Sequence, residues 1–457
     1  MTSVARLLAA AAGPAALLAP LAAQAAAAGQ PAVVAGRAFE VCCHGGDETV
    51  ARLALAAVEP VWPELCAFFG APLAPPRQRL QVHLYVDVKD YRDADRRLTG
   101  GRFLRNEAMS HWDTRSAHVA LQPPCPEALL AARGLPLQTE AMLAWEASHV
   151  ARYELCANFQ LHPGWFHDGL AGVVARRTLQ RRRPQHDAPP FFTQRWLRAQ
   201  RLARDGRLPG ARQLLTDETQ DLAMRDRYAA RVSFFAFAAE RAPDALRAVA
   251  QLVRGTKVGA GYAGEVAAAA TASLSGLDRA FQRALQDDPI AWDEQVRSLW
   301  CVGDEWTQRA FPQADAVAVR REPVGSGRLR ATGQVCVLDV GARRARLLLG
   351  LDDRGGYSLS LCPGEGFELQ QLGPQGEAQG VVARGACAEL RCGAFCPLEL
   401  SFEGRRLELQ LGSRRQRIAL PRALPPETRW GIAAAGAGVD DEYGSVVVWR
   451  GLRVRGV

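Results

Sequence analysis

Lysine is nearly absent from this 457-residue chain, although the chain is basic. Only Lys89 and Lys257 are lysines, so almost all of the 56 basic residues are arginines, and the formal net charge is +8. The densest arginine cluster, at 176–183, is not interleaved with aromatic residues as nucleic-acid sites are, and it matches no known binding motif. We therefore expect no nucleic-acid partner and interpret the arginines as solvated surface residues.

The chain also lacks any C-x-x-C pair, which argues against a zinc ribbon or a thioredoxin-like redox site. Its 11 cysteines are scattered, and their odd number leaves at least one thiol free or intermolecular. Cys387, Cys392 and Cys396 lie close together in the sequence, where one local disulfide would be compatible with export. Otherwise we expect buried, unpaired thiols.

After the N-terminus, no apolar run reaches the length of a membrane span. Residues 1–28 have the features of a signal peptide: Arg6 supplies a positive charge, residues 7–21 are apolar, and Ala23-Gln24-Ala25 matches an A-x-A cleavage site. Two prolines within this segment disfavour a stable span. We predict a cleaved signal peptide, a secreted or periplasmic protein, and no stable membrane span.

The most informative pattern is Leu143-Ala-Trp-Glu-Ala-Ser-His149. In an H-E-x-x-H helix, two imidazoles at i and i+4 ligate zinc and the glutamate is the general base. Here Trp145 stands at the first imidazole position, and an indole nitrogen has no lone pair for a metal. Glu146 and His149 are three residues apart and share a helix face. The pattern therefore predicts a zinc-site helix with one ligand missing.

A second segment, Gly164-Trp-Phe-His-Asp168-Gly-Leu-Ala171, follows a short gap. It is similar to P-x-W-L-x-E-G-L-A-E, which supplies the third zinc ligand in gluzincin peptidases, and residues 32–310 resemble the secreted, bacterial peptidase-MA-like group. The resemblance implies that Glu146 holds the general-base position, and that His149 and Asp168 hold ligand positions. Tyr228 falls where the family often has Y-A-Q-S-W, which implies a transition-state donor.

Only two ligand positions remain, whereas a catalytic zinc takes three protein ligands and a water. Asp168 is also one methylene shorter than glutamate, which shortens its reach by roughly 1.5 Å. The histidines that would supply the missing ligand are His111, His118, His162 and His167. On a helix, His167 should point about 100° away from Asp168. We expect no cofactor, and zinc if any metal binds.

The order of the patterns predicts an α+β region followed by helices. Strand patterns at 38–43, 79–86 and 117–121 alternate with helical patterns at 47–69 and 87–98, and residues 190–300 are helical. The resemblance implies a gluzincin-like N-terminal module: an α/β upper lobe with a mixed sheet to about residue 185, followed by a helical lower lobe.

Residues 315–457 change to short alternating runs separated by turns, which predict an all-β, jelly-roll sandwich of about nine or ten antiparallel strands. The runs are 335–340, 345–351, 357–361, 367–372, 398–402, 406–411, 417–420, 430–434 and 445–454. The last two resemble the closing strands of concanavalin-like domains, including laminin-G-like and sugar-binding modules. Asp440, Asp441 and Glu442 form an acidic loop, which we interpret as a solvated turn with calcium binding as the alternative.

Three functions are compatible with these patterns. The first is a secreted gluzincin-fold pseudopeptidase that binds peptide or protein in its cleft. The second is an active zinc metallopeptidase with non-standard ligands, and the third is glycan or cell-surface binding through the sandwich. We favour the first, because without a metal Glu146 gives only about 10²–10⁴-fold assistance as a general base. Trp145 would then fill the volume of the lost imidazole and metal.

Overall fold

The computed structural model describes most of residues 30–456. The gaps are Arg105, 123–129, 131–133, 157–162, 183–192, 217–218, 220, 256–261, 288–291, 295–298, 303–304, 311–314, 321–322, 326, 339–342 and 437–444. The predicted signal peptide, His162 and the acidic loop lie outside the described residues and stay predictions.

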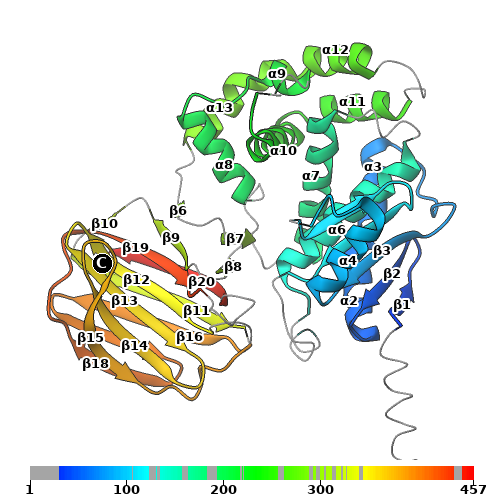
Figure 1. Cartoon of the computed structure of the whole chain (residues 1–457). Helices are drawn as coiled ribbons and strands as arrows, with labels where there is room; N and C mark the ends of the chain where they lie inside the picture. Colours follow the sequence, from blue (N-terminus) through cyan, green and yellow to red (C-terminus); the bar gives the residue numbers. More distant parts are fainter. Residues whose placement is uncertain are drawn as a thin grey trace, which may run out of the picture.

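A five-stranded mixed sheet begins the chain (Figure 1). Its order is β1 (Ala32–Ala35), β2 (Phe39–His44), β3 (Leu80–Tyr85), β5 (Ser116–Ala120) and β4 (Ala108–His111). Strands β2, β3 and β5 run parallel, whereas β1 and β4 are antiparallel edge strands. Alternation along each strand sends one set of side chains, such as Val41, Val82 and Val119, into the main core.

Helices cover both faces of this sheet. Helix α6 (Leu137–Leu155) packs on β5, and α2 (Glu48–Val58) packs on β1 and β2. Both α2 and α3 (Val61–Phe69) pack against α6. We had predicted one helix over 47–69, but the chain breaks at Pro60, which cannot donate a backbone hydrogen bond. On the other face, α4 (Val88–Thr99) packs Tyr91 against Tyr85 and Met109.

A group of helices follows, in which α10 packs against α7 and α8 (Figure 1). Their bounds are α7 (Gly164–Arg182), α8 (Thr193–Arg204), α9 (Ala211–Leu215), α10 (Met224–Arg241), α11 (Pro243–Gly255), α12 (Tyr262–Leu274), η2 (Ser275–Leu277) and α13 (Asp278–Asp287). Phenylalanines of α10 make edge contacts with Phe281 of α13 and Phe166 of α7. Among the described residues, no helix combines the length and apolarity needed to cross a membrane.

The C-terminal part consists of two antiparallel sheets. One has the order β15-β14-β13-β12-β19-β9-β6, with β10 also paired to β19, and the other has the order β18-β17-β16-β11-β20-β8-β7. The bounds are β6 (Trp292–Glu294), β7 (Leu299–Val302), β8 (Glu305–Arg309), β9 (Ala316–Arg320), β10 (Val324–Gly325), β11 (Arg328–Val337), β12 (Ala345–Asp352), β13 (Gly355–Cys362), β14 (Gly366–Leu372), β15 (Ala378–Gly385), β16 (Cys396–Glu403), β17 (Arg406–Leu411), β18 (Arg414–Ala419), β19 (Glu427–Ala434) and β20 (Val446–Gly456).

The predicted antiparallel sandwich is therefore confirmed, with a second core formed by residues such as Leu347, Leu359, Leu400 and Trp449. The sheets hold eight and seven strands, more than the nine or ten in total that we predicted. The strands that the sequence did not predict include β6, β7 and β8, which precede residue 315 and are short. Strand β15 was also missed, because it is largely exposed on both faces and therefore shows no apolar alternation. The gluzincin assignment of the N-terminal part stays a prediction.

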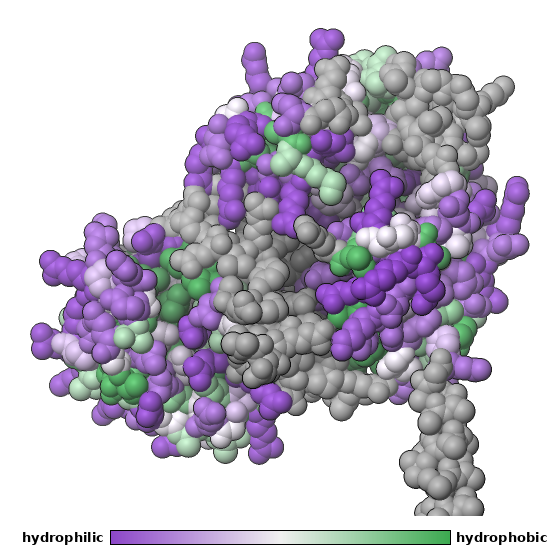
Figure 2. All heavy atoms as spheres, viewed as in Figure 1, coloured by the Kyte–Doolittle hydropathy of each residue, from purple (hydrophilic) through white to green (hydrophobic). Residues whose placement is uncertain are grey.

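The cysteine cluster of the sandwich contains no disulfide. Cys387, Cys392 and Cys396 are all free thiols, although the Cys387 and Cys396 side chains are hydrogen-bonded to one another. Burial raises the pKa of Cys396 to about 12. Among the residues drawn in colour, hydrophilic side chains predominate on the visible face (Figure 2).

Candidate functional site

Helices α6, α7 and α10 bring together the four residues singled out from the sequence. Glu146 and His149 come from α6, Asp168 from α7 and Tyr228 from α10. The Trp145 ring lies 5.9 Å from the His149 ring and 5.7 Å from the Tyr228 ring, measured between centroids. The charge of Asp168 raises the pKa of both Glu146 and Tyr228. The residues form one cluster, although their roles stay predictions.

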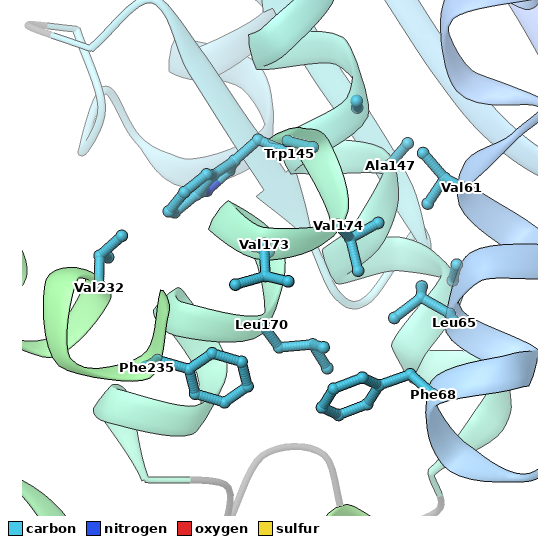
Figure 3. Close-up of a cluster of buried hydrophobic side chains, with 14 of the residues drawn as sticks. Val61, Leu65, Phe68, Trp145, Ala147, Leu170, Val173, Val174, Val232 and Phe235 are labelled. Atoms are coloured by element: carbon cyan, nitrogen blue, oxygen red, sulfur yellow. The ribbon is translucent and has the colours of Figure 1, made fainter. Parts of the chain in front are cut away.

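Trp145 is packed into the core between the helices. Its side chain is 6% exposed and lies near Val173 of α7 and Val232 of α10 (Figure 3). Gly172 of α7 makes room for the indole, because a Cβ added there would lie 2.9 Å from Trp145 Cζ3 and 3.1 Å from Val232 Cγ1. A large aromatic side chain therefore fills the space beside the ligand positions.

Glu146 is predominantly protonated at neutral pH. Burial raises the pKa of its carboxyl to about 8, and the hydrogen bond with Ser110 of β4 and the charge of Arg195 only partly offset this effect. A protonated carboxyl donates a hydrogen bond and does not accept a proton. The Glu146 carboxyl is therefore a hydrogen-bond donor in this packing.

The guanidinium of Arg195, in α8, lies against two neighbouring aromatic rings. Its Cζ is 3.9 Å from the centroid of the Trp145 ring and 4.6 Å from that of Tyr228. Both distances suit a cation held against an aromatic face. Burial raises the pKa of Tyr228 well above its usual value, and the charge of Arg195 opposes that shift. The phenol therefore stays protonated.

His149 is buried and stacked on a second histidine. Its ring is 4.1 Å from that of His167, with 15° between the planes. Burial and the charges of Arg152 and Arg195 hold the pKa of His149 well below its usual value, so the ring is neutral. Its Nδ1 has no hydrogen-bond partner within the part of the chain that the structure describes.

The expectation that His167 diverges from Asp168 was wrong. His149, His167 and Asp168 each bring one possible ligand atom within 4.8 Å of the others. The side chains of His167 and Asp168 both extend from the first turns of α7 toward His149 of α6. Their tips therefore lie close together, although the two side chains leave the helix in different directions. His118 instead lies on the opposite face of the sheet, hydrogen-bonded to Tyr85 Oη at 2.9 Å, and His111 follows the same alternation in β4.

Zinc does not fit this arrangement. An imidazole binds zinc through an in-plane lone pair at about 2.0–2.1 Å. The His149 and His167 planes are nearly parallel and stacked face to face, so one ion cannot lie in both planes. Arg152 also contacts His167, since its Nη2 donates to Nδ1 and its Nη1 donates to the backbone oxygen at 3.4 Å. Two guanidinium charges would further oppose a divalent cation.

Sequence reasoning missed the two arginines. Arg152 lies three residues after His149, so the helical spacing already placed it on the same face. Arg195 carries no such signal, because it reaches the cluster from α8, fifty residues after Trp145 in the chain. We had expected the arginines of this region to lie on solvated faces, and neither of these two does so.

Comparisons with known proteins match only part of the chain. No protein-family model and no curated protein matches it. The carbohydrate-binding module CBM66 from Bacillus subtilis matches with 14% identity over 36% of this chain and 95% of its own length, at a TM-score of 0.30. The Emp47p carbohydrate recognition domain matches with 8% identity over 37% of this chain and 89% of its own length, at 0.29. The exoplasmic/lumenal domain of VIP36, in a Ca²⁺/Man2-bound form, matches with 11% identity over 37% and 83%, at 0.28.

Proposed function

We propose that this chain is an exported, non-catalytic binding protein whose N-terminal unit, residues 32–310, holds an extended peptide or protein segment. The absence of hydrolysis is supported by the cluster itself, because the stacked His149 and His167 rings cannot both direct an in-plane lone pair at one zinc ion. Amide hydrolysis needs far more than the roughly 10²–10⁴-fold that acid–base assistance supplies.

The free edge of β4 is the observation that carries the binding function. Among the described residues, β4 pairs with β5 and ends the sheet, so its outer backbone groups have no strand partner. An extended peptide can add to such an edge through main-chain hydrogen bonds. Ser110 of β4 hydrogen-bonds to Glu146 and accepts from Tyr153 Oη at 3.3 Å, which fixes this edge beside the cluster.

Trp112 gives this edge an anchor for side chains. It directly follows β4 and is 51% exposed, which is unusual for an indole in a molecule whose other large aromatic residues are mostly buried. Tryptophan is enriched among the residues that dominate binding energy at protein interfaces. The edge therefore combines backbone pairing with a large apolar contact.

The test measures binding of reduced, carboxymethylated α-lactalbumin, a permanently unfolded polypeptide, to the full chain. Trp112→Ala should weaken binding by about tenfold or more. Leu73→Ala is the matched control, because Leu73 is 57% exposed and lies outside the sheet. Equal losses in the two variants, or no binding by the wild type, would reject the proposal.

The same preparation tests the alternative of an active metallopeptidase. We expect zinc far below one equivalent after purification, and no cleavage of a fluorogenic peptide mixture in added zinc. Cleavage that disappears in Glu146→Gln would establish peptidase activity in place of the proposed function.

Carbohydrate binding by the sandwich is a second candidate, favoured by the outer face of the β13 sheet. Ser358 and Ser360 alternate with core residues of β13 and so point outward, yet they are only 3% and 4% exposed. Their cross-strand neighbours include Glu368, Gln370 and Arg346. The longer polar side chains beside these hydroxyls carry the hydrogen-bond donors and acceptors that suit a hydroxyl-rich ligand.

A glycan array probed with the full chain tests this candidate. Glu368→Ala should abolish any signal, whereas Glu408→Ala, in the other sheet, should leave it unchanged. A signal that survives Glu368→Ala would place carbohydrate binding elsewhere, and an array without signal would exclude this candidate for the glycans present.

A further inference from the structure

The tryptophan that costs the site a metal ligand also creates a site for an organic cation. The Trp145 and Tyr228 rings are 5.7 Å apart and inclined at 44°, and the Arg195 guanidinium lies against both. Each ring presents a negative face to a cation, and Trp is the best of the aromatic residues at this. A histidine at position 145 would offer a poorer face.

Two acidic and two basic side chains surround the same point. Glu146 and Asp168 lie near enough for the charge of Asp168 to raise the pKa of Glu146. The charge of Arg195 lowers the pKa values of Glu146, His149 and Tyr228. The charge of Arg152 also lowers the pKa of His149. The chain thus supplies two positive charges of its own, as many as one zinc ion would bring.

We propose that the Arg195 guanidinium takes the place of the metal, as a cation tethered to the chain and held against the faces of both the Trp145 and Tyr228 rings. The proposal shares with the proposed function the premise that zinc is not held, but it does not depend on peptide binding.

Chemical rescue tests the cation site directly. Arg195→Ala removes the guanidinium and leaves the two rings, so Tm should fall. Methylguanidinium chloride at low millimolar concentration should then restore most of the lost Tm in a saturable way. Urea has a similar shape without the charge, so it should restore none of it.

Arg198→Ala provides the matched control. Arg198 lies on the same helix, but its guanidinium pairs with Asp226. Its loss should lower Tm without any recovery in methylguanidinium. Equal recovery of both variants, or recovery of Arg195→Ala by urea, would overturn the proposal, and so would an Arg195→Ala variant that methylguanidinium fails to stabilise.

A second measurement uses zinc as the competing cation. Trp145→His restores an H-E-x-x-H helix, with Asp168 as the third ligand. We expect this single variant to bind zinc weakly, because Arg195 remains beside the site. Trp145→His combined with Arg195→Ala should bind zinc at least about tenfold more tightly, since one positive charge is removed a few ångströms from the ion.

Competition with a chromophoric chelator measures both affinities, and circular dichroism confirms that each variant is folded. Equal zinc affinity with and without Arg195 would contradict the proposal. If Trp145→His does not fold, the rescue experiment alone decides. Neither readout involves the β4 edge, so failure here and failure of peptide binding remain separate outcomes.

Discussion

Two glutamates, one in each part of the molecule, lie between pairs of arginines but in opposite environments. Glu64 of α3 is 6% exposed and accepts hydrogen bonds from Arg177, at 3.0 Å, and from Arg181, both in α7. Glu408 of β17 has a side chain that is 32% exposed, and it contacts two arginines of the neighbouring strand at 2.5 and 2.8 Å.

The difference shows that one arginine-rich composition serves two physical purposes. In the sandwich the arginines pair across strands on solvated faces, and hydrogen bonds from Arg415 and Arg417 lower the pKa of Glu408. In the N-terminal part some arginines instead reach inward and join helices, as Arg152 and Arg195 do at the candidate site. Exposed pairs contribute little to stability, whereas removing one partner of a buried pair is costly.

The largest effect should come from breaking the buried pair. Glu64→Ala should lower the unfolding free energy by about 3 kcal/mol, at the low end for a buried ion pair because both arginines can turn toward water. Urea denaturation of the full chain, followed by tryptophan fluorescence, measures the change. Glu408→Ala is the matched control and should leave the transition unchanged. Equal shifts would remove the distinction between the two environments.

Packing around Trp145 should give the next largest effect. Gly172→Ala places a Cβ 2.9 Å from the indole, and overpacking of this kind costs about 1–3 kcal/mol. Gly276→Ala is the control, because nothing lies within 4 Å of the added carbon. Trp145→Leu in the Gly172→Ala background should recover part of the loss. Additive losses in the double variant would show that the two residues are not in contact.

The hydrophobic pattern of the sequence was sufficient to predict those strands and helices whose apolar residues alternate or repeat over many residues. Most strands of the sandwich between Val335 and Leu411 lie where the sequence predicted them, as does the helix bearing Glu146, because burial of one face imposes the period. Strand β15 was not predicted, and β11 begins earlier than predicted, at Arg328. The helical spacing also placed Glu146 and His149 on the same face of that helix. It did not indicate that His167 stacks on His149, because two side chains on different helices meet only after α6 and α7 pack.

The features that the sequence did not predict depend on contacts between residues far apart in the chain. The guanidinium of Arg195 is placed by the packing of α8 against α10, and the short strands β6 to β8 are defined by their partners β9 and β20. Such pairings leave no local period in the sequence. The Pro60 break was visible in the sequence, but the apolar residues on both sides of it share one helical face and obscured it.

A smaller effect should appear on acidification, from the face of the sheet that α4 covers. His83 and His118 are stacked at 4.6 Å, and burial lowers their pKa values from 6.5 to about 4 and about 3. As the pH falls, these histidines are protonated in the unfolded chain before they are protonated in the folded chain. The stability that depends on their neutral form is therefore fully present above pH 6.5 and is lost as the pH falls toward 4. His83→Gln should flatten the dependence of Tm on pH in this range. An unchanged slope would show that other groups cause it.

The pH effect of Glu146 has the opposite sign. Burial raises its pKa from 4.5 to about 8, so the folded chain holds a proton that the unfolded chain has already released between these values. The stability from the protonated carboxyl is fully present below pH 4.5 and is lost as the pH rises through 8. Glu146→Gln mimics the protonated form, so it should match the wild type in acid and exceed its Tm at alkaline pH. A Tm difference that is constant with pH would show that the pKa of Glu146 is not raised on folding, which would contradict this account of its burial.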